Sequence, residues 1–200
     1  MADINQAQKY VNMTDLNAPV ACGKSAEAKH GDGPPAAKGG ALPEAKLQEF
    51  AELLFFAYRD FISDPDAILS EIGFGRAHHR VLHFVNRNPG LCVADLLDIL
   101  KITKQSLGRV LKQLVDEGYI FQREGPSDRR QRLLFPTERG RAMALRLAAP
   151  QFARFAAAID ATSEADAQAA RRFLMAMVNE TERDQVAALL RGDKGSRETP

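Results

Sequence analysis

Two short helical segments separated by three residues constrain the fold of this 200-residue chain more than any other feature. The first is VADLLDIL at residues 93–100, and the second is KQSLGRVLKQLVDE at residues 104–117. The second segment places apolar side chains at the i, i+3, i+4 and i+7 spacing of a buried helical stripe, namely Leu107, Val110, Leu111 and Leu114. Thr103 suits the N-cap before this segment, and Gly118 suits the left-handed residue after it. The pattern predicts two helices joined by a tight turn.

A β-hairpin pattern follows the second helix directly. Residues 119–123 and 132–135 are rich in aromatic and branched apolar side chains, which favour strands. Residues 125–128, Gly-Pro-Ser-Asp, have the composition of a turn between them. Two helices in a tight turn followed by a hairpin are the parts of a winged helix-turn-helix. We therefore expect a mainly α fold with a β-hairpin wing, flanked by N- and C-terminal helices.

The face of the second helix opposite its leucine stripe carries amides, a hydroxyl and cations but no carboxylate. Its members are Lys104, Gln105, Ser106, Arg109, Lys112 and Gln113. The acidic residues Asp116 and Glu117 come only where the helix ends. A donor-rich face of this kind fits the base edges in the major groove. We expect this segment to be a recognition helix for double-stranded DNA.

The hairpin adds a cluster of cations at its tip and flanks, where phosphates or a minor groove can be reached. These are Arg123, Arg129, Arg130 and Arg132. Residues 101–141 hold ten Lys/Arg and five Asp/Glu, although the net charge of the whole chain is only +1. Such clustering is typical of a nucleic-acid interface. The alternative interpretation is a solvated basic face without a ligand.

Several classes of protein are excluded by composition. No apolar run approaches the about 20 residues of a membrane-spanning helix, and the start MADINQAQKY is unlike a secretory signal. Cys22 and Cys92 are too few for a disulfide framework. The chain has no Gly-rich phosphate loop after a strand, no Gly-x-Ser-x-Gly and no paired-cysteine metal site. We expect a cytoplasmic protein that is not an enzyme, has no membrane partner and needs no cofactor.

The remaining segments define the expected domain limits. Residues 1–42 are rich in Gly, Ala, Lys and Pro without apolar periodicity and are expected to be a disordered tail, and residues 192–200 a frayed one. Between them we expect one domain at 43–191. It divides into a helix and connection at 43–74, the winged helix-turn-helix at 75–136 and C-terminal helices at 137–191.

Local sequence signals place boundaries within these segments. The Asp64-Pro65-Asp66 segment is expected to interrupt the first helix, since a residue before proline is driven out of helical geometry. Thr137 and Ser163 suit N-caps of C-terminal helices, and Pro150 is expected to kink or split the first of these. A single last helix is expected to follow Ser163.

The first helix carries more aromatic surface than one small winged domain can cover. Five aromatic residues fall within twelve positions, namely Phe50, Phe55, Phe56, Tyr58 and Phe61. A patch of this kind usually marks an interface. We expect an obligate dimer that buries more than roughly 2,000 Å².

The sequence strongly resembles the MarR family of bacterial transcriptional regulators over about residues 45–190. The most specific stretches are ITKQSLGRVLKQLVDEGYI and SDRRQRLLFPTERG. The family hairpin reads Asp-x-Arg, an apolar strand, then Leu-Thr-x-x-Gly, and this chain matches it with Asp128, Arg130, Thr137 and Gly140. Pro136 replaces the usual leucine, and Lys101 stands where a glycine is frequent in the helix-turn-helix turn. A weaker similarity, GRAHHRVLHFVNRNPG, is to the alphaproteobacterial PetP-like subgroup.

The resemblance implies roles for particular residues. Arg130 would enter the minor groove, with Asp128 holding the wing arginines in position. Family members are homodimers whose terminal helices interlock, so the expected DNA partner is a pseudo-palindromic operator. The expected function is transcriptional repression that a small effector or stress signal releases. The alternative is a winged-helix protein-interaction or dimerisation module that does not bind DNA.

Family members also bind small aromatic or anionic molecules between the dimerisation helices and the winged domain. In this chain, that pocket would be bordered by Tyr58, His79, Arg80 and His83; the alternative is that all four pack or face solvent.

The histidines and cysteines suggest two further interpretations, both disfavoured. His78, His79 and His83 invite a metal site, but no HExxH pattern accompanies them, and no metal is expected. Cys92 precedes a helix whose dipole can lower a thiol pKa, although a small packed residue is the better interpretation.

Overall fold

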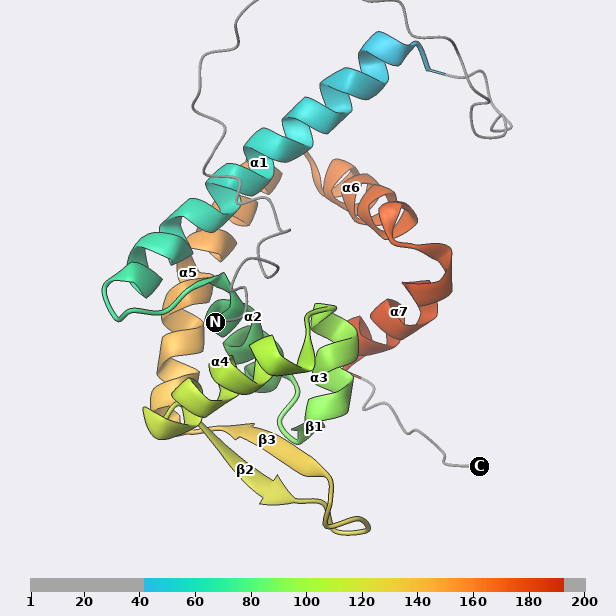
Figure 1. Cartoon of the computed structure of the whole chain (residues 1–200). Coiled ribbons are helices and arrows are strands. Elements are labelled where there is room, and N and C mark those ends of the chain that lie inside the picture. The colour runs from blue at the N-terminus through green and yellow to red at the C-terminus, as the bar shows by residue number, and fades with distance from the viewer. Residues whose placement is uncertain (1–41, 193–200) are drawn as a thin grey trace, which may run out of the picture. The chain divides into compact units, whose positions relative to one another are not determined.

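The computed structural model describes residues 42–192, which form seven α-helices, one 3-10 turn and a three-stranded sheet (Figure 1). The N-terminal helix α1 spans Glu44–Ser70 and α2 spans Arg76–Arg87. The strand β1 (Leu91–Cys92) leads into α3 (Val93–Leu100) and α4 (Lys104–Asp116), and then come β2 (Ile120–Glu124) and β3 (Arg132–Pro136). The C-terminal helices are α5 (Glu138–Asp160), α6 (Glu164–Met177) and α7 (Arg183–Arg191), with the 3-10 turn at Glu180–Glu182. The two expected tails lie outside the described residues, apart from Leu42 and Gly192.

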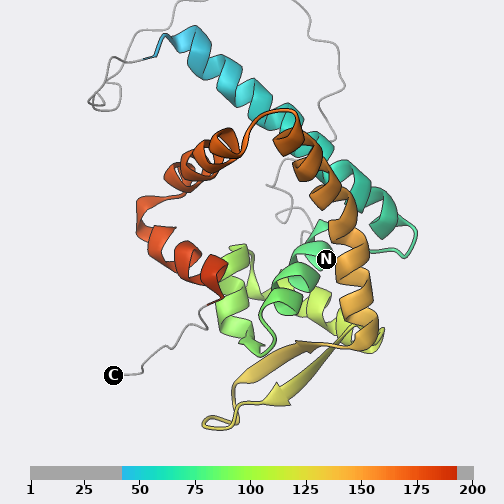
Figure 2. The same cartoon turned by 180° about the vertical axis from the view of Figure 1, so that it is seen from behind.

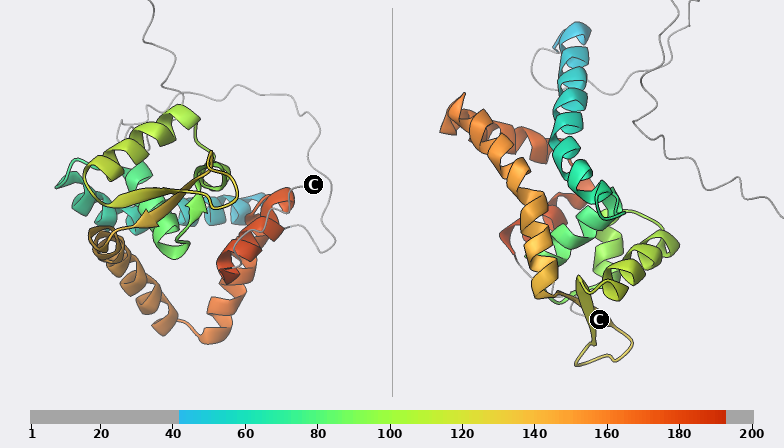
Figure 3. Two further views of the ribbon diagram at one scale, coloured as in Figure 1. Left: turned by 90° about the horizontal axis from the view of Figure 1, so that it is seen from below. Right: turned by 90° about the vertical axis from the view of Figure 1, so that its left-hand side faces the viewer.

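The predicted mainly α fold with a hairpin wing is confirmed. The sheet is antiparallel with the order β1-β3-β2, and the hairpin pairs Phe121 with Phe135 and Arg123 with Leu133. Helices α2, α3 and α4 contact this sheet, and the view from below in Figure 3 shows the hairpin in front of them. The sequence did not indicate β1, because two residues are too short to show a periodic pattern.

The helix-turn-helix follows the sequence prediction closely. Thr103 caps α4 by accepting a hydrogen bond from the Ser106 amide at 3.1 Å, and Gly118 ends it with φ +73°. The leucine stripe of α4 is buried in a core shared with α2, α3 and the sheet. Lys101 in the turn has φ 50° and ψ 42°, and it is the only non-glycine residue with positive φ in the described part of the chain. At this position the family frequently has a glycine, and this chain has a lysine in the left-handed conformation that glycine adopts readily.

The predicted interruption of the first helix is wrong. Helix α1 continues through Pro65, which is buried. Proline lacks the N–H that would bond to the carbonyl of Phe61, one turn earlier. The side chain of Gln151 on α5 donates to that carbonyl instead, at 3.2 Å. A tertiary hydrogen bond therefore replaces the missing helical one.

The C-terminal helices also differ from expectation. Helix α5 runs through Pro150 without being split, whereas the predicted single last helix is divided into α6 and α7. The side chain of Arg183 donates to the backbone carbonyls of Ala176 and Val178 at 2.8 and 3.0 Å. These carbonyls at the end of α6 therefore have hydrogen-bond partners although the helix does not continue. Figure 2 shows α6 and α7 leading back towards α3, where Lys101 pairs with Glu182 at 3.2 Å.

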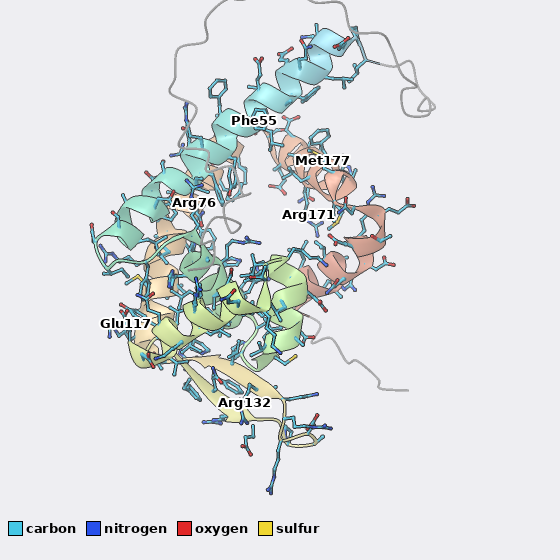
Figure 4. The ribbon with its side chains drawn as sticks, in the orientation of Figure 1. Phe55, Arg76, Glu117, Arg132, Arg171 and Met177 are labelled. Carbon is cyan, nitrogen blue, oxygen red and sulfur yellow. The ribbon has the colours of Figure 1, made fainter. Side chains whose placement is uncertain are left out.

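Large apolar side chains on α1, α5 and α6 are exposed. They include Phe50, Leu53, Phe55, Phe56, Phe152, Phe155, Phe173 and Met177. Figure 4 marks Phe55 on α1 and Met177 on α6. Within residues 42–192, no helix combines the length and apolar character needed to cross a membrane.

Candidate nucleic-acid interface

Helix α4 exposes a polar surface on the side away from its buried leucine stripe. Lys104, Gln105, Ser106, Arg109 and Lys112 are all exposed, as expected for a face that meets a ligand. The Ser106 hydroxyl accepts a hydrogen bond from the Thr103 hydroxyl at 2.9 Å. Lys112 pairs with Asp116 one turn further along the helix. The N-terminal two turns therefore present a hydroxyl, an amide and cations to solvent.

Gln113 does not belong to this exposed face. It is half-buried; its side-chain oxygen lies 3.0 Å from Nε2 of His78 on α2, and its amide nitrogen donates to Glu117 at 2.9 Å. Position 113 follows the buried Val110 by three residues, so it lies at the border of the packed stripe. The expectation that Gln113 lies on the exposed face is therefore corrected, because its side chain is half-buried and is hydrogen-bonded to His78 and Glu117.

The tip of the wing is organised by Asp128. Its carboxylate accepts the backbone N–H of Arg130 at 2.9 Å and the Arg130 side chain at 3.3 Å. The backbone hydrogen bond is the main cause that lowers the pKa of Asp128, followed by that arginine's side-chain bond and charge. The Arg130 side chain is still 94% exposed, so the guanidinium extends from the tip. The geometry permits Arg130 to meet a phosphate or a groove while its backbone is held.

The other wing arginines differ in their surroundings. Arg129 is exposed, and its carbonyl accepts a hydrogen bond from Arg132 at 3.1 Å. Arg132, marked in Figure 4, also pairs with Glu124 across the hairpin at 3.1 Å. Arg132 therefore stiffens the hairpin as well as adding charge to it. Gly125 is required at the turn, because a Cβ there would lie 2.8 Å from the carbonyl of Asp128.

Thr137 and Gly140 connect the wing to α5. The Thr137 hydroxyl donates to the carbonyl of Gly118 at 2.7 Å and accepts the N–H of Gly140 at 3.0 Å, which caps the helix. A Cβ at Gly140 would lie 2.0 Å from the carbonyl of Tyr119, so only glycine allows this approach. The Thr-x-x-Gly pattern thus fixes the end of α4, the wing and the start of α5 together.

A second candidate site lies where α1, α2 and α5 meet. A cavity of about 250 Å³ is lined by all four residues considered for an effector, Tyr58, His79, Arg80 and His83. Arg76 at the cavity pairs with Asp66 at 2.8 Å, whereas Arg80 donates to the backbone carbonyl of Leu100 at 2.9 Å. The four residues therefore line one cavity, whose wall carries both apolar and cationic groups.

The pKa values of the two histidines of this cavity are both lowered, which favours the neutral imidazole. Burial is the main cause that lowers the pKa of His79, and the nearby His83 lowers it further, against the opposing effect of Asp66. Burial also lowers the pKa of His83, with an added contribution from Arg87. Neutral imidazoles both donate and accept hydrogen bonds, so they suit a polar uncharged group of a ligand.

Cys92 is a structural thiol in this fold. It is the N-cap of α3, where its sulfur accepts the N–H of Asp95 at 3.4 Å and its S–H donates to the Asp95 carboxylate at 3.0 Å. Burial and the Asp95 carboxylate raise the pKa of Cys92, which opposes the effect of the helix dipole. In residues 42–192, no three His, Cys, Asp or Glu side chains are grouped as metal ligands would be.

Two features near the interface were missed by the sequence analysis, although each has a weak signal in the sequence. His78 bridges α2 to α4, and only its place three residues after Gly75, in the first turn of a helix, pointed to a capping role. Arg123 lies 5.1 Å from the ring centre of Phe121 and 5.3 Å from that of Phe135, and these rings are stacked. The Phe-x-Arg spacing, with Phe135 on the opposite strand, is the sequence signal for that arrangement.

Comparisons with known proteins give a consistent result. Residues 72–131 match the model of the MarR family. The HTH-type transcriptional regulator PetP of Rhodobacter capsulatus is 44% identical over 138 residues, which cover 69% of this chain and 83% of that protein. This relative confirms the resemblance to the PetP-like subgroup.

Solved structures share the fold. A MarR family transcriptional regulator of Listeria monocytogenes, complexed with a 26mer DNA, has a TM-score of 0.56 and 24% identity, covering 75% of this chain and 97% of that one. FabT of Streptococcus pneumoniae in complex with DNA has a TM-score of 0.58 and 19% identity, covering 66% and 94%.

Proposed function

The chain belongs to the MarR family of transcriptional regulators, and we propose that it binds double-stranded DNA sequence-specifically through α4 and the β2–β3 wing. The observation that carries this proposal is the exposed face of α4 between Lys104 and Lys112, which has hydrogen-bond donors and cations but no carboxylate. A generic surface helix mixes both signs of charge. The donor-rich composition found here fits the base-edge acceptors of the major groove and the phosphates beside it.

We assign different roles to the two elements. Lys104, Gln105, Ser106 and Arg109 read or approach base edges, and Lys112 contacts the phosphate backbone beside them. Arg129, Arg130 and Arg132 of the wing act through phosphates or the minor groove, with Asp128 holding the tip. Base contacts give specificity, whereas phosphate contacts give affinity and register.

The functional unit in this proposal is a homodimer. The exposed aromatic and aliphatic residues of α1, α5 and α6 form a surface that a second copy would cover. A groove of about 690 Å³ between α5, α6 and α7, lined by Phe155, Leu174 and Val186 among others, belongs to the same surface. Two copies would present two recognition helices to half-sites about one helical turn apart in a pseudo-palindromic operator.

We propose repression as the activity, in the cytoplasm and without catalysis, with release by a small effector in the cavity of Tyr58, His79, Arg80 and His83. The position of this cavity supports the proposal, because its Arg80 is bonded to the end of α3, directly before the turn into α4. If Arg80→Ala and His83→Ala both leave ligand-induced release from DNA unchanged, the cavity is not the effector site.

The DNA-binding proposal is tested by footprinting on genomic fragments with the purified full chain. We expect protection of discrete promoter sequences that contain an inverted repeat, with binding that weakens as salt is raised. The opposing outcome is a protein that retains no fragment above background at low salt. That result would favour a winged-helix module for protein interaction or dimerisation.

A further inference from the structure

His78 forms a directed hydrogen bond between α2 and the recognition helix. Its Nδ1 accepts the backbone N–H of Gly75 at 3.1 Å. Because a backbone N–H can only donate, Nδ1 carries no proton, and the proton of the neutral imidazole is on Nε2. Nε2 lies 3.0 Å from the side-chain oxygen of Gln113 on α4, so His78 is the donor in this contact.

A second hydrogen bond extends this connection along α4. The amide nitrogen of Gln113 donates to the carboxylate of Glu117 at 2.9 Å, which leaves its oxygen for His78. The direction of each bond is therefore determined from Gly75 through His78 and Gln113 to Glu117. This series connects the start of α2 to the C-terminal turn of α4.

Packing holds the His78 ring in place. Phe74 stacks on it with a centroid distance of 4.5 Å and an interplanar angle of 10°, and Phe74 in turn meets the edge of Tyr119 at 5.2 Å. Arg139 on α5 donates to the carbonyl of Glu117 at 2.6 Å and to the Tyr119 hydroxyl at 3.0 Å. Glu117 is marked at this end of the helix in Figure 4. The C-terminal end of α4 is thus held from both α2 and α5, while its polar N-terminal turns face solvent.

We propose that His78 is a positioning residue for DNA readout, which fixes the orientation of α4 through Gln113. This inference rests on the proposed function, because it assumes that α4 reads bases. Hydrogen bonds to base edges require placement within about 0.5 Å, whereas wing contacts with phosphates depend mainly on charge. Loss of the His78–Gln113 bond therefore reduces discrimination between sequences more than general affinity for DNA.

Two matched substitutions separate the two bonds of His78. His78→Asn retains an acceptor close to the Nδ1 position and removes the donor to Gln113. His78→Gln provides an amide long enough to reach Gln113 and removes the acceptor for Gly75. Gln113→Leu breaks the same bond from the α4 side without changing α2.

The measurement is the ratio of affinities for a footprinted duplex and a scrambled duplex of equal composition, at one salt concentration. We expect His78→Asn and Gln113→Leu each to lower affinity for the footprinted duplex about tenfold and to leave the scrambled duplex within about twofold. The double variant is expected to lose no more than Gln113→Leu alone, because both substitutions remove the bond between His78 and Gln113, whereas Gln113→Leu also removes the bond from Gln113 to Glu117. His78→Gln is expected to retain most of the discrimination.

The inference is overturned if His78→Asn and Gln113→Leu are folded and keep the wild-type ratio. It is equally overturned if both weaken binding to the two duplexes by the same factor, because His78 then only stabilises the fold. A wild-type protein that does not distinguish the two duplexes would contradict the proposed function itself.

Discussion

Gln151 on α5 donates its side-chain amide to the backbone carbonyl of Phe61 on α1, at 3.2 Å, and this is the carbonyl that Pro65 leaves without a helical partner. Gln151 is only 7% exposed, and it is the one buried polar residue of the described core. A buried amide is tolerated when it is hydrogen-bonded. The pair thus explains both the buried glutamine and the continuity of a helix that contains a proline.

Replacing Gln151 should lower the free energy of unfolding substantially only when residue 65 is a proline. Gln151→Leu is expected to lower the free energy of unfolding by about 1–2 kcal/mol, because the Phe61 carbonyl loses its partner. In a Pro65→Ala background, residue 65 has an N–H for that carbonyl, and the same substitution should cost less than half as much. Urea unfolding of the wild type, the two single variants and the double variant measures the difference. An equal cost in both backgrounds would show that the bond does not compensate for the proline.

Lys101→Gly should be more stable than Glu182→Gln, which removes the same ion pair but leaves the left-handed lysine in place. Lys101 has φ 50°, a left-handed conformation that glycine adopts without the steric cost of a Cβ, and the expected gain is about 0.5–1 kcal/mol. The substitution also removes the exposed ion pair with Glu182, which is worth less than about 1 kcal/mol. Glu182→Gln, measured alongside by thermal unfolding, separates the two effects. Destabilisation by Lys101→Gly beyond that of Glu182→Gln would contradict this interpretation of the turn.

The stability of the protein should fall on acidification through the histidine range. The pKa values of His79 and His83 are lowered in the folded protein, so the unfolded chain binds protons first as the pH drops below about 6.5. Their contribution is complete above that pH and is lost as the pH falls through the folded pKa values.

Unfolding free energies at about pH 7.5 and about pH 5.5, at one protein concentration, test this expectation. The double variant His79→Gln/His83→Gln should show a smaller decrease than the wild type. The same decrease in both proteins would place the pH dependence on other groups.

The protein should be dimeric at micromolar concentration. The aromatic side chains of α1 are exposed, with Phe55 at 59%, and the apolar faces of α5 and α6 add to this surface. We expect a sedimenting dimer and an interface in the obligate class, above roughly 2,000 Å². Phe55→Glu together with Phe56→Glu should shift the protein towards monomer. A wild-type monomer at these concentrations would contradict the proposed assembly.

The sequence predicted best those elements whose signals are local. The Thr103 cap, the leucine stripe of α4 and Gly118 lie within one short segment, and the structure has helix α4 where they place it. The hairpin turn is equally local, because Gly125 and Asp128 act on neighbouring backbone groups.

The errors concern contacts between distant segments. Local rules place a helix break at Pro65, but the compensating Gln151 is far along the chain. The helical pattern predicts an exposed Gln113, because it does not show that His78 on α2 takes the side-chain oxygen of Gln113. The family resemblance predicts that Tyr58, His79, Arg80 and His83 border one pocket, and the packing of α2 against α1 and α5 brings them around one cavity.

The central claim is that α4 reads bases and the wing supplies charge, and Arg109→Ala and Arg130→Ala separate these roles. Arg109 lies one turn after Ser106 on the exposed face of α4 and can reach the acceptors of a guanine, so its loss should cost about 1–3 kcal/mol per half-site and relax preference at one base position. Arg130 extends from the wing tip with its side chain 94% exposed, so its loss should weaken binding to all sequences similarly.

The measurement that tests this most directly is affinity against salt concentration for the wild type and both variants, on footprinted and scrambled duplexes. We predict that Arg109→Ala removes discrimination between the duplexes and changes the salt slope little. Arg130→Ala should keep the discrimination and reduce the slope of log affinity against log salt by about one. If Arg109→Ala retains full discrimination, or Arg130→Ala leaves affinity and slope unchanged, the roles assigned to the recognition helix and the wing are wrong.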